Sequence, residues 1–210
     1  MLTSYENEMA AAVGRVAEAE RRARQIVGDV EGREEKYTEV FRTHLESLLN
    51  NFSEGRVSWR VVTYTTDKQS GQETRIGADL VVAVDISLDG VRQSKGFLVQ
   101  AKVNKNTRYG VSVDSRRTLD GQCGVMRTHS NEAYVFAYGN QSTKVLKANS
   151  VLSGAALSDI PNKGIGEFFG EVMMCWAGDP KIAAHSHREL ETLVKRMEGR
   201  SGVLLQANSS

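Results

Sequence analysis

Residues 73–103 read ETRIGADLVVAVDISLDGVRQSKGFLVQAKV and contain two apolar runs. The runs, Leu80 to Ile86 and Gly96 to Val103, are rich in Val, Leu and Ile, and the polar turn Leu-Asp-Gly-Val-Arg-Gln-Ser at 88–94 separates them. Apolar runs of about four to eight residues that are bounded by turn residues are typical of buried strands. The segment therefore predicts two buried strands joined as a hairpin.

Three polar residues stand together at the open end of this hairpin. Asp79 lies at the head of the first strand, and Gln100 and Lys102 lie two positions apart in the second, so their side chains leave the same face. Lys is almost never fully buried unless it is paired, and an unpaired buried charge is very costly. Carboxylate and carbonyl oxygens suit Mg²⁺ or Mn²⁺. A neighbouring Lys can orient or deprotonate a water and offset charge that builds on a phosphate.

The spacing of these residues resembles that of the PD-(D/E)XK nucleases, the family with the restriction-endonuclease-like fold. In that family an Asp opens one strand and an acid-x-Lys triplet lies on the next. Here Gly77-Ala78-Asp79 is similar to the first element, and Gln100-Ala101-Lys102 to the second in a Gln-x-Lys form familiar in Mrr-like and anti-phage defence nucleases. The resemblance covers the middle third of the chain. In the alternative interpretation the hairpin is an ordinary one, in which Asp79 caps a turn, Lys102 lies at an edge and Gln100 faces solvent.

An amide oxygen is a weaker metal ligand than a carboxylate, so the resemblance requires a further acid. A helix predicted from Arg33 to about Phe52 places Glu34 on its apolar side and Glu35 away from it, at about 100° per residue. Because the first core helix of the family often supplies such an acid, Glu34 is the first candidate and Glu35 the second. Glu73, shortly before the Gly-Ala-Asp, is the third. As alternatives, Glu34 serves the first turn of its helix electrostatically and Glu73 is an exposed loop acid.

Periodicity and residue type predict the remaining elements. A long amphipathic helix is expected over Thr3 to about Val30. Such a helix either packs across its own domain or pairs with a partner chain, and its thin stripe of small apolar residues favours the second. Downstream we expect strands at Val57 to Thr65, Ala133 to Tyr138 and Thr143 to Lys147, helices at Leu119 to His129, Phe168 to Trp176 and Ser186 to Met197, and an edge strand at Gly202 to Gln206. Ser186 and Glu189 form a capping box for the last helix.

Basic residues gather in the sequence after the hairpin. Lys105 and Arg108, with Arg116 and Arg117, are the most basic group near the predicted site. Lys and Arg close to a metal centre guide a polyanion, so this group predicts phosphate contacts. A solvated loop is the alternative. The helix that carries Gln122 also resembles one that flanks the cleft of defence nucleases, and its Gln is a further candidate for substrate contact.

The composition is that of one α/β domain. The 210 residues suffice for a domain with an appendage, and a formal net charge of +1 argues mildly against a nonspecific nucleic-acid coat. No apolar run approaches the ~18 residues that span a bilayer, and the N-terminus lacks the features of a signal peptide. Cys123 and Cys175 suggest neither a disulfide framework nor a CxxC metal site. We therefore expect a cytoplasmic protein without membrane contact.

Together these observations predict an α/β fold with a restriction-endonuclease-like core, a central mixed sheet of about five strands flanked by helices. Residues 1–31 are expected to form an N-terminal association helix, and residues 32–210 the nuclease-like domain. The resemblance implies a deoxyribonuclease dependent on Mg²⁺ or Mn²⁺, acting in defence against phage or foreign DNA, in which Asp79, Gln100 and Glu34 hold the metal and Lys102 activates water.

Cleavage of both DNA strands suits a homo-oligomer with paired sites, and a toxic activity implies a regulatory protein partner. Two other interpretations stay open at this point. One is a non-catalytic module that binds nucleic acid or protein on the same scaffold. The other is an oligomeric scaffold organised by the first helix.

Overall fold

The structure is a computed structural model that describes residues 2–28, 34–66, 78–103, 113–139 and 141–210. Its helices are the 3₁₀ helix η1 (Leu2–Tyr5) and the α-helices α1 (Glu6–Val27), α2 (Glu34–Leu49), α3 (Val113–His129), α4 (Ala148–Val151), α5 (Ile165–Met173) and α6 (His187–Arg196). Its strands are β1 (Ser53–Glu54), β2 (Val57–Thr65), β3 (Leu80–Leu88), β4 (Val91–Val103), β5 (Ala133–Tyr138), β6 (Thr143–Lys147), β7 (Asn162–Gly164) and β8 (Ser201–Ser209).

Within the described residues these strands form one mixed sheet of eight, in the order β1-β2-β8-β3-β4-β5-β6-β7. The pairs β3–β8 and β4–β5 are parallel, and the other neighbours are antiparallel. The α/β class and the mixed sheet are as predicted, but the predicted count of about five strands is wrong. Two of the extra strands, β1 and β7, have only two and three residues, too short to produce a periodic signal in the sequence.

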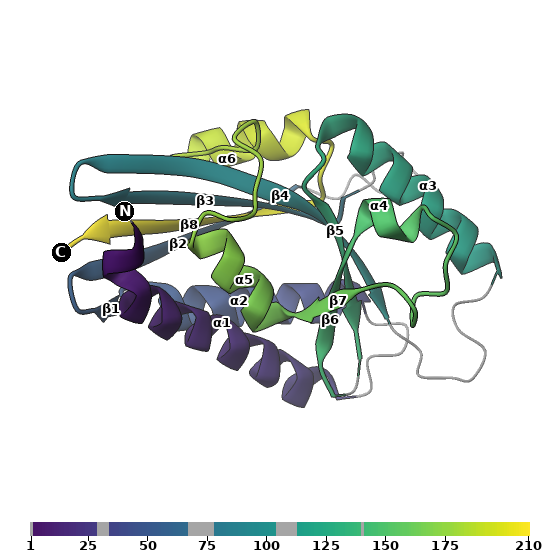
Figure 1. The fold of residues 1–210 in the computed structure, drawn as a ribbon, viewed down its shortest axis with the longest axis horizontal. Coiled ribbons are helices and arrows are strands. Elements are labelled where there is room, and N and C mark those ends of the chain that lie inside the picture. The colour runs from purple at the N-terminus through teal and green to yellow at the C-terminus, as the bar shows by residue number, and fades with distance from the viewer. Residues whose placement is uncertain (1, 29–33, 67–77, 104–112, 140) are drawn as a thin grey trace.

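Helices cover both faces of the sheet (Figure 1). The side chains of α1, α2 and α5 pack on one face, in a core with Val82, Val84 and Phe97. The side chains of α3, α4 and α6 pack on the other, in a core with Val81 and Ala83. Because neighbouring strand residues point to opposite faces, each buried strand contributes to both cores.

Three strands and one cap are found as the sequence predicts. β2, β5 and β6 have the predicted bounds. At the start of α6 the Glu189 N–H donates to the Ser186 hydroxyl over 3.2 Å, which confirms the predicted cap. Each of these features depends on neighbouring residues alone, and for that reason the sequence reveals it.

β3 and β4 form the predicted antiparallel hairpin. The turn that joins Leu88 to Val91 has two residues, Asp89 and Gly90, with φ of 50° and 77°. Asp-Gly with both φ angles positive is the pattern of a two-residue turn whose twist matches that of the strands. The predicted turn at 88–94 is therefore too long, because the polar residues after Gly90 continue the strand.

The C-terminal strand β8 lies in the middle of the sheet, so its prediction as an edge strand is wrong. It runs antiparallel to β2 and parallel to β3, with Ser201 opposite Leu80. Its residues Val203, Leu204 and Leu205 are 0 % exposed. A strand covered on both faces has a continuous apolar run instead of an alternating one, and the Val-Leu-Leu run has this character.

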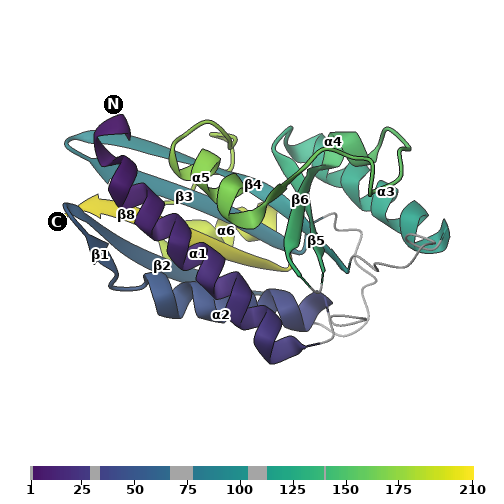
Figure 2. The same ribbon diagram turned by 60° about the horizontal axis from the view of Figure 1, so that its bottom comes forward.

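The N-terminal helix α1 belongs to the core of the same chain. Met9, Ala12, Val16 and Ala19 are at most 1 % exposed, and α1 packs along α2 and α5 (Figure 2). Most of its apolar stripe is thus covered within the chain, whereas Ile26 of the same stripe is 60 % exposed. The association role of residues 1–31 stays a prediction. No helix in the described part of the chain is long and apolar enough to cross a membrane.

Candidate functional site

The candidate site lies where β3 begins and β4 ends. Asp79 directly precedes β3, and the antiparallel register places Leu80 opposite Val99. Gln100 and Lys102 follow on β4 and, by alternation, lie on the sheet face that α3, α4 and α6 cover. The hairpin thus brings residues 21 positions apart in the sequence into contact.

Asp79 and Gln100 are joined by hydrogen bonds. The Gln100 amide group donates from Nε2 to Asp79 Oδ2 and to the Ala101 carbonyl over 3.2 Å. The Ala101 N–H donates to the same Asp79 oxygen over 2.9 Å. Gln100 is only 2 % exposed, and its Oε1 is buried with no hydrogen-bond partner in the described structure. A buried acceptor left without a donor is costly, so this oxygen is a feature that a ligand would explain.

Burial raises the pKa of the Asp79 carboxyl above its ordinary value. The hydrogen bond from the Ala101 N–H and the charges of Arg200 and Lys102 lower this pKa but do not cancel the effect of burial, and Glu35 adds to the increase. The side chain of Asp79 is 15 % exposed. A carboxyl held in a partly dehydrated place among specific charges is characteristic of functional sites.

Arg200 and Ser201 also belong to this site, and sequence reasoning missed both. Arg200 Nε lies 3.6 Å from Asp79 Oδ1, and its Nη1 lies 2.5 Å from Glu35 Oε1. The Ser201 hydroxyl donates to the backbone carbonyl of Asp79 over 2.9 Å. These residues come more than 120 positions after Asp79, at the start of β8, and they become neighbours only because β8 pairs with β3.

Among the candidate acids, Glu35 is the one that the structure connects to Asp79, through Arg200. The Glu34 carboxylate makes no hydrogen bond or ion pair with the described residues, and its backbone carbonyl accepts from the Thr38 hydroxyl over 2.9 Å. Both acids lie in the first turn of α2, where a negative charge is favourable. The third candidate, Glu73, lies outside the described residues.

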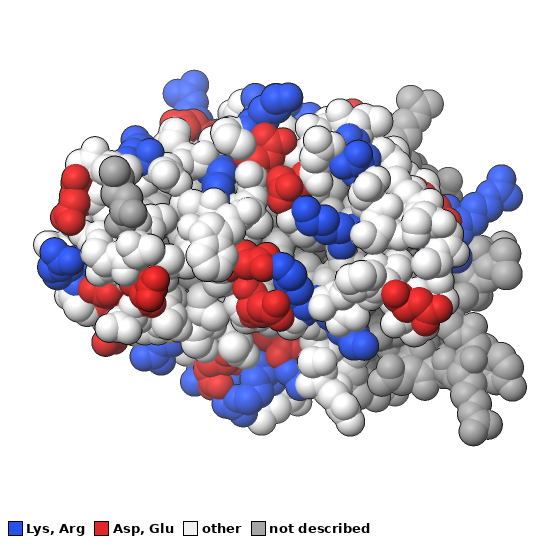
Figure 3. Space-filling view, viewed as in Figure 1, with Lys and Arg blue, Asp and Glu red and all other residues white. Residues whose placement is uncertain are grey.

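The basic candidates are only partly described. Lys105 and Arg108 lie outside the described residues. The Arg116 side chain makes contacts within the fold: it pairs with Asp120 at 2.9 Å and donates to the backbone carbonyls of Val151 and Ala155. Arg117 is exposed. On the face seen in Figure 3, basic and acidic side chains are interspersed.

The donor types match those that a hard divalent cation such as Mg²⁺ or Mn²⁺ prefers, the ion that the resemblance implies, although the Gln100 group that faces Asp79 in this structure is its amide nitrogen. Asp79 offers a carboxylate, Gln100 an amide oxygen that has no partner, and Glu35 a second carboxylate joined to the same arginine. Oxygen donors of this kind are those that such ions prefer. No cluster of three or more His, Cys, Asp and Glu side chains is present among the residues that the structure describes, so the amide oxygen is essential to this donor set.

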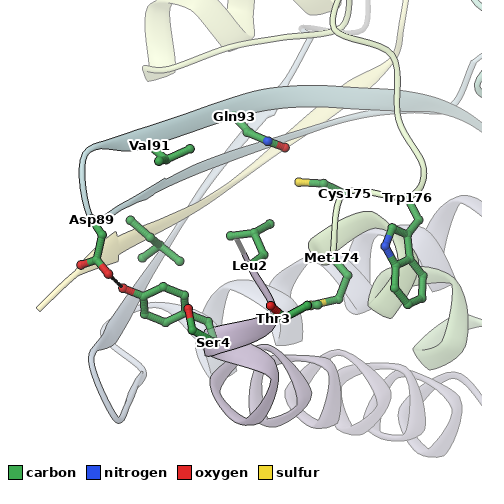
Figure 4. Close-up of a pocket in the computed structure, with 11 residues that line it drawn as sticks. Leu2, Thr3, Ser4, Asp89, Val91, Gln93, Met174, Cys175 and Trp176 are labelled. Carbon is green, nitrogen blue, oxygen red and sulfur yellow. Dashed lines mark hydrogen bonds between the residues drawn. The ribbon is translucent and has the colours of Figure 1, made fainter.

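A separate pocket of about 510 Å³ lies at the other end of β3 (Figure 4). Leu2, Asp89, Cys175 and Trp176 are among the residues that line it. The nine residues of β3, at about 3.3 Å each, place it roughly 30 Å from Asp79. The pocket is therefore distinct from the candidate site.

Comparison with models of known families, with curated proteins and with solved structures finds no match for this chain. The site is thus defined by its own geometry.

The raised pKa of Asp79 leads to a prediction about stability. Because the folded pKa lies above the unfolded one, the folded state holds the proton more tightly, and stability falls as pH rises through this window. Asp79→Asn should therefore be more stable than the wild type at pH 7, with a Tm about 2–4 °C higher, and this difference should shrink toward zero below about pH 4. Thermal unfolding between pH 3.5 and pH 8 measures it.

Asp85 provides a matched control, because its pKa is shifted in the opposite direction. It is 4 % exposed on the same strand, and although burial acts to raise its pKa, hydrogen bonds from Arg92 and His185 bring that pKa below its ordinary value. The stabilisation of the fold by the ionised Asp85 carboxylate is present at neutral pH and is lost on acidification. Asp85→Asn should therefore lower Tm at pH 7. A lower Tm for Asp79→Asn as well would show that the Arg200 ion pair outweighs the burial of Asp79.

Proposed function

We propose that this protein is a metal-dependent endonuclease that hydrolyses phosphodiester bonds in DNA, in defence against phage or foreign DNA. The observation that carries the proposal is the contact between the half-buried Asp79 carboxylate and Gln100, whose amide oxygen has no partner in the described structure. Lys102, two residues further on the same strand, contributes a positive charge that lowers the pKa of Asp79. The hairpin lies between α2 and α3, the helical context that the resemblance to PD-(D/E)XK nucleases implies.

The residues of the chain have separate roles in this proposal. Asp79, Gln100 and an acid of the first turn of α2, Glu35 or Glu34, hold Mg²⁺ or Mn²⁺. The bound cation stabilises negative charge on the phosphate and lowers the pKa of a water molecule. Lys102 orients that water and offsets charge on the phosphate oxygens.

Access of DNA to the site depends on basic side chains. Arg117 is exposed on α3, the helix that packs over the site face, and it is the described candidate for a phosphate contact. Lys105 and Arg108 are retained as candidates from the sequence. The Gln122 amide oxygen on the same helix is buried without a partner in the described structure, so a contact between this atom and nucleic acid would require its side chain to turn outward.

Two further parts of the proposal concern the assembly. Double-strand cleavage is supplied by two copies of the site, as in a homo-oligomer, and a regulatory partner controls the activity. The buried thiol of Cys123 and the half-buried thiol of Cys175 are both free, in keeping with a reducing cytoplasm.

Incubation of the full chain with supercoiled plasmid tests the proposal. With Mg²⁺ or Mn²⁺ in excess over protein and DNA phosphate, the wild type should convert plasmid to nicked and linear forms, and EDTA should stop the conversion. Linear single- and double-stranded DNA and RNA of the same sequence identify the preferred substrate. Plasmid that stays intact with both metals, at protein concentrations that bind it, would contradict the enzymatic proposal.

A non-catalytic module that binds nucleic acid or protein is the second candidate function. It is favoured by one observation: Arg200 neutralises Asp79, as expected in a site that no longer binds metal. DNA binding without cleavage, unchanged by EDTA and by Asp79→Ala, would support the module. Loss of binding in Arg117→Ala would then locate its interface on α3.

A further inference from the structure

We infer that Arg200 is a displaceable counter-cation: it neutralises Asp79 and Glu35 in the metal-free protein, and a divalent cation must displace it to bind. This inference rests on the proposed function and concerns how its site is loaded. Arg200 contacts both carboxylates, at 3.6 Å from Asp79 and 2.5 Å from Glu35. One guanidinium group thus bridges two of the proposed metal-holding acids.

The charges of the site favour a cation that replaces the Arg200 side chain over a cation that binds beside it. Asp79 and Glu35 carry two negative charges, and Arg200 and Lys102 carry two positive charges, so the charges of these four side chains balance. A divalent cation added to this neutral group would face two like charges at close range and in partly buried surroundings, where they repel more strongly than in water. Removal of the guanidinium group from Asp79 restores a net attraction.

The backbone of Arg200 is fixed, so that only its side chain is able to leave. Its N–H donates to the Ala78 carbonyl over 3.3 Å, and its carbonyl accepts from the N–H of Thr66 over 3.1 Å and from the hydroxyl of Thr66 over 2.9 Å. The side chain is 36 % exposed, and that of its partner Glu35 is 62 % exposed. The guanidinium group is therefore partly open to solvent, and its departure would need rotation of side-chain bonds without a shift of the backbone.

Cation binding without DNA tests this inference independently of catalysis. Mn²⁺ is titrated by calorimetry into the full-length wild type and into Arg200→Gln, at about 0.15 M salt. Arg200→Gln should bind Mn²⁺ about tenfold more tightly, within the range usual for coupled equilibria. Its metal-free form should be less stable, because two carboxylates are left unneutralised. Arg196→Gln is the matched control, since Arg196 is exposed on α6 and donates to the Lys181 carbonyl; its affinity should equal that of the wild type within about twofold.

The outcomes separate this inference from the proposed function. If Mn²⁺ binds to none of these proteins, or binds equally to Asp79→Asn, the proposed metal site fails. If Mn²⁺ binds the wild type in an Asp79-dependent way and Arg200→Gln binds it equally or more weakly, the displacement inference is overturned while the site stands.

A measurement on the wild type keeps the test valid if Arg200→Gln does not fold. The Nε–Hε signal of Arg200 is assigned by nuclear magnetic resonance through its absence in Arg200→Lys. Addition of diamagnetic Mg²⁺ should increase the exchange rate of this proton with water, because the side chain moves from the site into solvent. An unchanged exchange rate at saturating Mg²⁺ would overturn the inference.

Discussion

Asp79→Ala should reduce Mg²⁺-dependent cleavage of plasmid on the order of 10³-fold, the size of effect seen when one group that stabilises transition-state charge is removed. The variant lacks the carboxylate that contacts Gln100 among the described residues, so in the proposed site the cation would lose one of its two carboxylate ligands. Initial rates of nicking, measured against enzyme concentration at saturating Mg²⁺, give the ratio.

Two variants show whether the loss of cleavage comes from the missing carboxylate or from unfolding. Asp79→Asn keeps the shape of the side chain and should gain stability, so low activity in this variant does not arise from unfolding. Asp85→Asn removes a carboxylate buried on the same strand and should retain wild-type activity at temperatures well below its Tm. Cleavage by Asp79→Ala within about threefold of the wild-type rate would contradict the assigned site.

Lys102 should contribute to cleavage without contributing to metal binding, unlike Asp79. Lys102→Ala should lower the cleavage rate by about 10²-fold or more, the lower end of the effect of a positioned proton-transfer group, while Mn²⁺ affinity measured without DNA stays equal or rises because a positive charge is removed. Lys144→Ala, on an exposed position of β6, is the control. A Lys102 variant with full activity would restrict this residue to a structural role.

Gly96→Ala should unfold the protein or lower its Tm by about 10 °C. A Cβ atom at this position of β4 would lie 2.0 Å from the Val82 carbonyl oxygen and 2.5 Å from that of Ile182. Both atoms are backbone, so neither moves by a change of rotamer. Gly96 also exchanges two hydrogen bonds with Asp179, at 3.1 and 2.8 Å. Relief of the clash therefore requires strands to separate, at a cost of about 3 kcal/mol or more.

Thermal and urea unfolding measure the effect, with Gly121→Ala as the control. Gly121 lies on α3 with nothing within 4 Å of an added Cβ atom, and Ala is favoured over Gly in a helix by about 1 kcal/mol. The two glycine variants should thus shift Tm in opposite directions. A Tm for Gly96→Ala within about 2 °C of the wild type would show that the backbone packing around β4 is looser than the structure describes.

The features of the fold that could be predicted from the sequence are those determined by residues close together in the chain. The β3–β4 hairpin, β5, β6 and the Ser186 cap follow from residues close in the chain, because periodicity, turn residues and capping are local. The central position of β8 does not, since any buried strand has the same composition and its neighbours are chosen by the packing of the whole sheet.

The candidate site likewise contains residues that the sequence predicts and residues that only the tertiary structure reveals. Asp79 and Gln100 are predicted together because two strands of one hairpin carry them, and the register of a hairpin is determined by its turn. Arg200 has no local signal, since an arginine before a short apolar run is ordinary on any protein surface. The angle around α2 placed Glu34 toward the core, but a side chain in the first turn of a helix reaches beyond the helix end, and there the contact with Arg200 favours Glu35.

The position of β8 has a consequence for the order in which the protein matures. During synthesis β2 and β3 leave the ribosome well before residues 200–209, and each then has an unpaired edge where β8 will insert. Neither the arginine bridge nor the Ser201 contact with Asp79 exists until that insertion. The contacts that neutralise and anchor Asp79 are therefore the last part of this centre to form.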